Sequence, residues 1–399
     1  MDDVLRLCLS THFIMAAKFV LPLLSVFVFY AIFYFAEING ANKLVFESIE
    51  ARKLPSVDAS LRTVYTGIAP LDELLTVLTV FFWPTTDGSN VSLLVHSIGF
   101  SGTFGAAWVL VSLEAWRRGN AWTLAAFPMV LGLLAQVMTF AFATPLYCAI
   151  QLFTSVTAVT PNAENIRVPR AVLKALPWVF VVGFMVPSAL LVVPVSETVS
   201  TDLKQLFIAA WHPWPGYVSI LLTTAHVIFS PFTKLDRAVE GGRATLHSLR
   251  WVYAFAFGLA AITHLISWII PLAAVAEPRL FKEEYLEALH PLAVFAIPKP
   301  WETPVPVESV GAGVHAFLRW DYLIGSAGVL VWATSLYRTA HRVVYGRSGC
   351  VGLFVKIVLL TALTGPVAAA VELIWERDEL IINELGGVKR VAPAQKKRL

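Results

Sequence analysis

The stretch YTGIAPLDELLTVLTVFFWPTTDG, residues 65–88, decides the fold. It is apolar between Pro70 and Pro84, and its polar side chains recur at steps of four, three, four and three residues. That spacing places them on one stripe of a helix: Asp72, Thr76, Thr79, Trp83 and Thr86. Because hydrocarbon cannot satisfy polar groups, the stripe must face protein or a water-lined cavity. We therefore predict that this stretch is a membrane span and one wall of an internal site.

The composition of the whole chain agrees with a membrane location. The protein has 399 residues, of which 57% are hydrophobic and 14% charged, and its mean hydropathy is +0.70. Soluble domains carry about 25% charged residues. The net charge of +3 is too small to indicate nucleic acid, and three isolated cysteines (Cys8, Cys148 and Cys350) indicate neither a disulfide framework nor a zinc site. We expect an integral membrane protein.

Apolar runs predict the spans. Beyond residues 65–88 they are 19–36, 93–113, 172–195, 206–229, 251–275, 314–336 and 351–375, with one longer run at 122–159. A span needs about 20 residues, so the longer run forms two short spans, one span with an interfacial helix, or a re-entrant segment. Arginines lie on both sides of it, at Arg117 and Arg167, and the positive-inside tendency places both on the cytoplasmic side. An even number of crossings satisfies this, and we favour two.

The chain shows no heptads and no repeat of 20–50 residues. The predicted fold is all-α: a polytopic integral membrane helical bundle of about 8–10 transmembrane helices. It is a single domain over residues 1–399, with polar termini at 1–18 and 376–399. With the basic loops on the cytoplasmic side, Asn90 in the sequon Asn90-Val91-Ser92 faces the lumen, so we predict a glycosylated multi-pass protein of the endoplasmic reticulum.

Acids and aromatic residues inside spans are the candidate site residues, since a charge at the bilayer centre is costly. Asp321 starts a second stripe at the same spacing, followed by Gly325, Gly328, Trp332 and Ser335, and the last span carries Glu372 and Glu376. The glycines allow a neighbouring helix or a ligand to approach closely. Within spans lie three tryptophans suited to lining a cavity: Trp108, Trp268 and Trp332.

Each of these residues also has a plainer interpretation. An acid near the end of a span is more often a cap or an interfacial residue, which applies to Asp72, Glu114 and Glu376, and tryptophans at span ends usually form the interfacial belt. Asp321 has Arg319 nearby and Glu376 is followed by Arg377, so ion pairing is expected for both. Asp72 and Glu372 are then the preferred proton donors. The lone histidines His226 and His264 are expected to form hydrogen bonds across helices.

Missing motifs narrow the chemistry. The sequence has no Walker A loop, no dinucleotide-binding glycine motif, no H-E-x-x-H and no D-D-x-x-D. We therefore predict neither a metal nor a cofactor. Acids and aromatic rings in a dry site suit proton-initiated cation chemistry, in which a carboxylic acid with a raised pKa donates a proton. Aromatic faces then stabilise the positive charge.

Three segments carry a resemblance to a known family. Residues 65–88, residues 108–122 (WVLVSLEAWRRGNAW) and residues 145–157 (PLYCAIQLFTSVT) resemble the fungal membrane-bound terpene cyclases of meroterpenoid pathways, of the ascochlorin, ascofuranone and macrophorin type. The resemblance implies cyclisation of a farnesyl chain, epoxidised at its end and attached to an aromatic or polyketide head group, without a metal or other cofactor. It carries over no functional residue.

The function expected is that of a membrane-bound terpene cyclase. Its catalytic acid is expected among Asp72, Glu372, Asp321 and Glu376, and its substrate-binding residues are Thr76, Trp83, Trp108 and Trp332. Expected partners are the hydrophobic prenylated substrate, membrane lipid, and the prenyltransferase and epoxidase of the pathway, but no nucleic acid. Two other classes remain open at this point: a transporter or exporter of a secondary metabolite, and a non-catalytic membrane scaffold for pathway enzymes.

Overall fold

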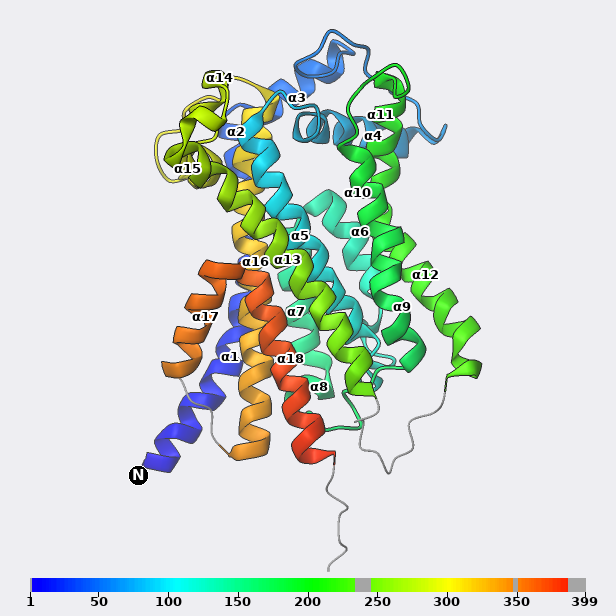
Figure 1. Cartoon of the computed structure of the whole chain (residues 1–399), viewed down its shortest axis with the longest axis vertical. Coiled ribbons are helices and arrows are strands. Elements are labelled where there is room, and N and C mark those ends of the chain that lie inside the picture. The colour runs from blue at the N-terminus through cyan, green and yellow to red at the C-terminus, as the bar shows by residue number, and fades with distance from the viewer. Residues whose placement is uncertain (1, 234–244, 347–350, 387–399) are drawn as a thin grey trace, which may run out of the picture.

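The computed structural model describes residues 2–233, 245–346 and 351–386. These residues form helices and no strand, apart from one isolated β-bridge between Lys53 and Ser60. The long helices lie side by side, and shorter helices cap the upper end of the molecule (Figure 1). The predicted all-α class is therefore confirmed.

The helices follow one another with short connections. They are α1 (Asp2–Val28), α2 (Phe35–Ile38), α3 (Ala41–Glu50), α4 (Ala69–Phe82), α5 (Val91–Ala115), α6 (Pro128–Met138), α7 (Phe140–Thr154), α8 (Val156–Val159), α9 (Arg170–Phe180), α10 (Val186–Leu191), α11 (Thr201–Trp211), α12 (Trp214–Phe229), α13 (Leu246–Ala276), α14 (Glu283–Leu286), α15 (Pro291–Phe295), α16 (Val310–Tyr345), α17 (Val351–Thr364) and α18 (Pro366–Leu385). One π-helical turn joins α1 to α2 (Phe29–Tyr34) and another joins α9 to α10 (Val181–Met185).

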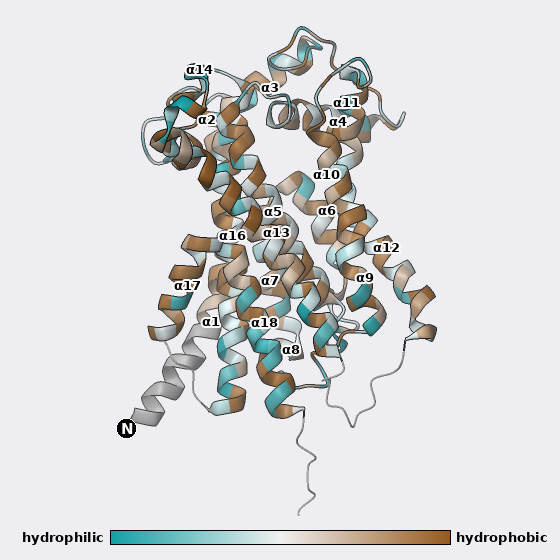
Figure 2. Ribbon diagram, in the orientation of Figure 1, coloured by the Kyte–Doolittle hydropathy of each residue, from teal (hydrophilic) through white to brown (hydrophobic). Residues whose placement is uncertain are grey.

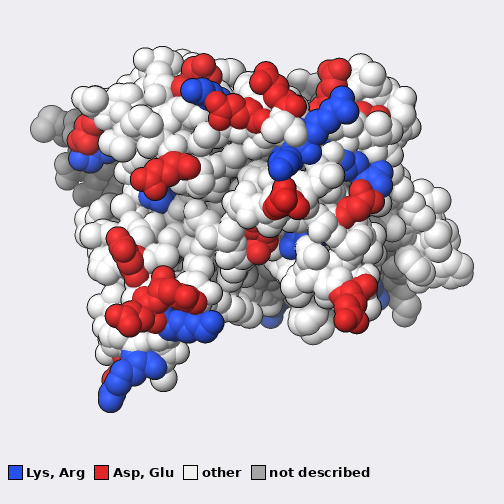
Figure 3. All heavy atoms as spheres, turned by 90° about the horizontal axis from the view of Figure 1, so that it is seen from above, with Lys and Arg blue, Asp and Glu red and all other residues white. Residues whose placement is uncertain are grey.

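Four helical segments among the described residues are long and apolar enough to cross a membrane. They are Met15–Ile38, Val91–Ala115, Arg170–Leu191 and Leu246–Ala276. Apolar residues cover much of the middle of the ribbon (Figure 2), whereas acidic and basic side chains of both signs spread over the upper end (Figure 3). The distribution supports the predicted association with a membrane.

The stretch that opens the sequence argument forms a shorter helix than predicted. Within residues 65–88 only α4 is α-helical, and a 3-10 turn at Trp83–Thr85 follows it. Pro70 lies in its first turn, and Pro84 follows its end. At 1.5 Å per residue the 14 residues of α4 extend about 21 Å, which is less than the roughly 30 Å of a hydrocarbon core. The helix lies at the upper end, near α3 and α11 (Figure 1), and the prediction of a full span there is corrected.

The long apolar run at 122–159 forms a helical hairpin. The chain turns at Thr139, whose φ of +83° breaks the run between α6 and α7. These helices have 11 and 15 residues, about 16 and 22 Å, so neither is long enough to cross. The hairpin starts and ends at the same side, because Arg118 N donates to Arg167 O (2.8 Å). The re-entrant alternative therefore replaces the two crossings that we favoured, while the even parity holds.

Two glycines explain how the central helices pack so closely. A Cβ on Gly325 of α16 would lie 2.2 Å from the Phe140 ring of α7, and one on Gly102 of α5 would lie 2.5 Å from the Leu259 carbonyl oxygen of α13. Real Cβ atoms do not approach this closely, so only glycine fits. Helices α5, α7, α13, α16 and α18 therefore form a dense centre around which the other helices are arranged.

Candidate functional site

The polar stripe of α4 faces protein, as its spacing predicted. Asp72, Thr76, Thr79 and Trp83 are all buried. The Tyr65 and Thr79 hydroxyl groups share a hydrogen bond of 2.8 Å, and the Lys204 ammonium group lies 5.6 Å from the centroid of a Trp83 ring. The stripe therefore fixes α4 to the preceding loop and to α11.

Asp72 holds the loop before α4 in place. One of its carboxylate oxygens accepts hydrogen bonds from Tyr65 N (3.0 Å), Thr66 N (2.7 Å) and the Thr66 hydroxyl group (2.9 Å), and the other accepts one from Gly67 N (3.0 Å). The bond from the Thr66 backbone is the largest influence on the pKa of Asp72, and together these donors lower it although burial acts in the opposite direction. A proton donor needs a raised pKa. The geometry therefore assigns Asp72 a loop-stabilising role and corrects its place among the preferred donors.

Glu372 and Glu376 share one cation. The Lys356 ammonium group lies 3.8 Å from Glu372 and forms a close ion pair with Glu376. Both carboxylates are partly exposed, with side-chain exposures of 30% and 39%. The expected pairing of Glu376 with its neighbour Arg377 is wrong, because successive residues of a helix point about 100° apart and Arg377 turns into the core.

Asp321 is the one acid of the four that is buried away from cations in the described part of the chain. It is 4% exposed, and its Oδ1 accepts a hydrogen bond from Ala141 N (2.6 Å) in the first turn of α7. The expected pairing with Arg319 is wrong, because Arg319 donates instead to the Ala296 carbonyl oxygen and to His315 Nδ1.

The tryptophans predicted to bind substrate occupy separate places. Trp108 packs against Trp214 (centroids 6.1 Å apart) and Phe104 (6.4 Å) at the centre of the bundle. Trp332 donates from its indole nitrogen to Gln151 Oε1 (2.9 Å), and Trp83 lies beside Lys204. All three are buried, but the structure does not bring them together with each other or with the four acids in one site.

A buried network of ions joins five parts of the chain at the lower end of the bundle. Glu114 bonds to Arg117 and Arg377 (3.2 Å), and Arg117 bonds to Asp378 (2.7 Å). Each of these four side chains is at most 1% exposed. Tyr253 on α13, Gln151 on α7 and Thr157 on α8 complete the hydrogen bonds, at 2.6, 3.0 and 2.5 Å from the two carboxylates. With two acids and two arginines the network is neutral, as burial requires.

The sequence argument assigned Glu114 only a capping or interfacial role. The spacing of Glu114 and Arg117, three residues apart on one helix face, was the available signal. The partners on α18 come from more than 260 residues further along the chain and have no local signature.

An apolar cavity of about 520 Å³ lies between α5, α13, α16 and α17, and we call it the aromatic pocket. Its lining comprises His96, Gly99, His264, Ser267, Trp268, Phe295, Ile297, Arg319, Tyr322, Leu323, Ser326, Ala327, Leu330, Thr361, Ala362 and Pro366. Trp268 and Phe295 stack with centroids 4.2 Å apart and an interplanar angle of 17°. Of the tryptophans expected to line a cavity, Trp268 does so here.

The polar groups of the aromatic pocket gather near one end. His96 packs against Tyr322 (centroids 5.7 Å apart) and His315 (5.5 Å). His315 Nε2 bonds to the Val294 carbonyl oxygen (3.0 Å), so its Nδ1 accepts from Arg319 (2.9 Å). Within the described residues, His96 Nε2 and Arg319 Nε are buried and make no hydrogen bond. Since buried polar groups are normally satisfied, these two atoms suit contacts with a polar group of a ligand.

None of the four predicted acids lines the aromatic pocket. Asp321 comes next to Tyr322 in the chain, but on the helical projection it lies about 170–180° from the centre of the α16 residues that line the pocket. Its carboxyl group therefore faces α7, and α16 separates it from the cavity.

Comparisons with known proteins identify the family. A model of the CtvD domain matches residues 17–382. Terpene cyclase ctvD of Aspergillus terreus is 30% identical over 94% of this chain and 100% of its own length. Terpene cyclase penA of Penicillium crustosum is 27% identical over 89% and 94% of the two chains, and terpene cyclase ascI of Acremonium egyptiacum is 29% identical over 87% of each.

No solved structure matches the chain. The family model and the relatives, which are aligned over most of their length, confirm the resemblance that the sequence segments carried. They also favour an enzyme over the transporter and the scaffold. The chain therefore belongs to the CtvD domain family of fungal terpene cyclases and is an enzyme of the terpene cyclase type.

Proposed function

We propose that this enzyme cyclises a prenylated metabolite, an epoxyfarnesyl chain on an aromatic or polyketide head group, by a metal-free reaction that begins with protonation. The observation that carries the proposal is the aromatic pocket in a member of this family. Its volume of about 520 Å³ lies within the roughly 300–1,000 Å³ of small-molecule sites. Its position among apolar helices suits a substrate that partitions into the membrane.

The walls of the pocket suit a migrating positive charge. Carbocations form as an epoxide or alkene is protonated and its chain closes into rings, and an aromatic face attracts a cation through its quadrupole. Trp268, Phe295 and Tyr322 present such rings to the cavity. The mainly apolar lining excludes water, which would otherwise quench the cation.

The polar end of the pocket suits the oxygen atoms of the substrate. The Arg319 Nε–H group is a permanent donor, because arginine keeps its proton in proteins. His96 Nε2 lies on the same lining and donates or accepts according to its tautomer. In our proposal these two groups orient the oxygenated part of the substrate, so that the prenyl chain extends along Trp268 and Phe295.

The acid in our proposal is Asp321. It is buried, and it lacks the competing interactions of the other three acids: the four donors of Asp72 and the Lys356 ion pairs of Glu372 and Glu376. Desolvation favours the neutral, proton-donating form of a carboxyl group. Because Asp321 faces α7, the reacting end of the substrate would reach the α7 side of α16.

A microsomal assay with a synthetic epoxyfarnesyl arene tests the reaction and the acid together. Wild-type enzyme should form cyclic product, and EDTA should leave the rate unchanged. Asp321→Asn keeps size but removes the acidic proton, and general acid catalysis contributes about 10²–10⁴-fold, so we expect a loss in that range at normal protein levels. Glu372→Gln, the matched control, should lose only a few-fold. An active Asp321→Asn variant together with an inactive His96→Gln variant would place the acid on the pocket wall instead.

A second variant tests the aromatic wall. A desolvated cation–π contact is worth about 2 kcal/mol, and 1.4 kcal/mol is tenfold in rate, so Phe295→Leu should slow cyclisation about thirtyfold while substrate still binds. Trp122→Ala, at a side chain that is 95% exposed, is the control for a lost aromatic group and should leave the rate unchanged. Equal losses from both substitutions would show that the pocket is not the site of reaction.

A further inference from the structure

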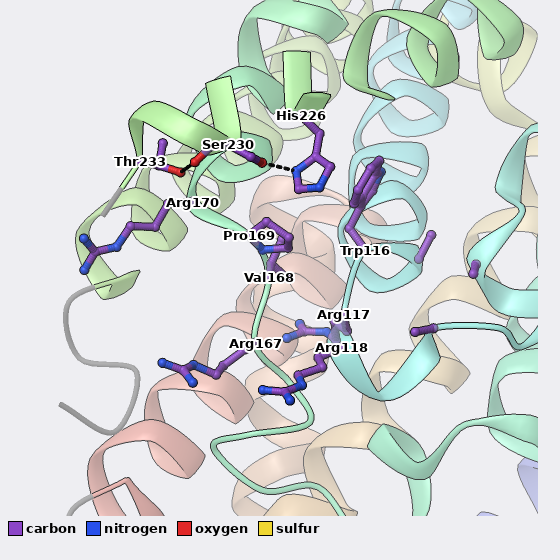
Figure 4. A pocket seen from close by; sticks show the side chains of 13 residues that line it. Trp116, Arg117, Arg118, Arg167, Val168, Pro169, Arg170, His226, Ser230 and Thr233 are labelled. Carbon is purple, nitrogen blue, oxygen red and sulfur yellow. Dashed lines mark hydrogen bonds between the residues drawn. The ribbon is translucent and has the colours of Figure 1, made fainter. Parts of the chain in front are cut away.

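A second cavity of about 720 Å³, here called the basic pocket, shares no residue with the aromatic pocket. Figure 4 shows its lining, which is Ala115, Trp116, Arg117, Arg118, Ala121, Ala126, Arg167, Val168, Pro169, Arg170, His226, Ser230 and Thr233. The residues come from the segment that follows α5, the segment that leads into α9, and the end of α12. Trp116 and His226 pack together with ring centroids 4.9 Å apart.

The lining of the basic pocket is positively charged. It contains four arginines and no acid. The two buried carboxylates Glu114 and Asp378 accompany Arg117 from behind. One carboxylate, that of Glu164, serves both Arg118 and Arg167 (3.0 Å). More guanidinium than carboxylate charge therefore faces the cavity, which suits an anion.

The ends of two predicted spans fix the depth of the basic pocket. Arg170 is the first residue of the apolar segment Arg170–Leu191, and Arg117 comes two residues after the end of Val91–Ala115. The pocket therefore lies where hydrocarbon gives way to lipid head groups. The positive-inside tendency places this arginine-rich end in the cytoplasmic leaflet, which carries anionic lipids.

An apolar groove of about 620 Å³ continues from the basic pocket, and the two share Thr233. Helices α9 and α12 form its walls. Trp178 and Phe232 line it although they are 66% and 83% exposed. An anion site joined to an apolar groove of this kind matches a molecule with an acidic head and hydrocarbon chains.

We propose that the basic pocket and its groove bind an anionic glycerophospholipid. Arginine side chains bind the phosphate and the acidic head group, since the guanidinium fork matches phosphate geometry. The acyl chains follow the groove along Trp178 and Phe232. A zwitterionic lipid would bring its ammonium group against the arginines, and inorganic phosphate would leave the groove uncovered. The site is separate from cyclisation and does not rest on the proposed substrate.

Lipid titration of the purified full-length chain in a neutral detergent tests this proposal. The readout is the midpoint of thermal unfolding, because a ligand that binds only the folded state raises it. Phosphatidylserine should raise the midpoint in a saturable manner, whereas phosphatidylcholine and inorganic phosphate should not. An equal effect of phosphatidylcholine would exclude recognition of the acidic head, and an equal effect of phosphate would identify a site for free anions; either result would overturn the proposal.

Variants locate the effect. Each Lys or Arg near an anionic surface contributes about 1 kcal/mol, so the double variant Arg118→Gln/Arg170→Gln should weaken phosphatidylserine binding about thirtyfold. The control Arg279→Gln removes an exposed arginine near α14 and should bind like wild type. Ala121→Glu keeps all four arginines and adds a negative charge to the lining, so it should weaken binding even if the double variant folds poorly. Unchanged binding by Ala121→Glu would refute this location.

Discussion

Replacing Glu114 by glutamine should destabilise this protein far more than replacing an exposed acid. The Glu114 carboxylate is buried and bonds to Arg117, Arg377 (3.2 Å), Gln151 (3.0 Å) and Thr157 (2.5 Å). The amide keeps the shape but removes one of the two negative charges that balance two buried arginines. Breaking a buried pair by removing one partner costs about 3–5 kcal/mol, and 4 kcal/mol corresponds to roughly a thousandfold change in the folding equilibrium.

The charge argument makes a sharper prediction for a double variant. Arg377→Met alone should also be costly, because Glu114 and Asp378 would then face one arginine. The combination Glu114→Gln/Arg377→Met removes one charge of each sign and restores neutrality. Its cost should therefore be smaller than the sum of the single costs by about 1–3 kcal/mol, the range of coupling between contacting residues.

Denaturant unfolding of the purified protein in mixed micelles measures these costs. The reference variant is Glu164→Gln, whose exposed pair with Arg118 should contribute less than about 1 kcal/mol. If Glu114→Gln costs no more than Glu164→Gln, or if the double variant costs the full sum, charge balance does not hold this part of the bundle together.

Three further predictions follow from other sites. Gly325→Ala should cost about 1–3 kcal/mol through overpacking against Phe140, whereas Gly258→Ala, where nothing lies within 4 Å, should cost nothing, and equal stabilities would contradict the close approach. Asn90→Gln should abolish an N-linked glycan shift on a gel, while Asn90→Asp should abolish it yet keep the acceptor that caps α5 at Leu93 N, so only the glutamine variant should lose about 1 kcal/mol; a shift retained in either variant would refute the glycan. Because the pKa of Asp72 is lowered in the fold, its stabilisation is present above the ordinary value near 3.8 and is lost as the pH falls through the lowered value, so the stability gap between wild type and Asp72→Asn should close below about pH 4; a gap that widens there would mean the reverse shift.

The sequence by itself determined the class of the fold and the family. Long apolar runs require helices, because a bilayer leaves no other way for a single chain to satisfy its backbone. The spacing of Asp72, Thr76, Thr79 and Trp83 correctly predicted a buried stripe, and the glycines at 325 and 328 correctly marked a close contact, which is with α7. The arginines around residues 122–159 correctly predicted that the two ends of that run meet.

Only the tertiary structure decided the lengths and the partners. Hydropathy counts apolar residues but does not detect a turn such as the one at Thr139, so a hairpin resembled two spans. Sequence proximity suggested that Arg319 pairs with Asp321 and Arg377 with Glu376. The helical rotation of 100° per residue instead directs these neighbours to different faces, where His315 and Glu114 meet the arginines.

The candidate site shows the same division. His96, Trp268, Phe295 and Tyr322 come from four helices, and no spacing within one segment predicts that they line one cavity. Their local sequences supply apolar and aromatic surfaces, which burial requires of any membrane bundle. Which of those surfaces close around a cavity depends on contacts between helices far apart in the chain, and those contacts exist only once the bundle has packed.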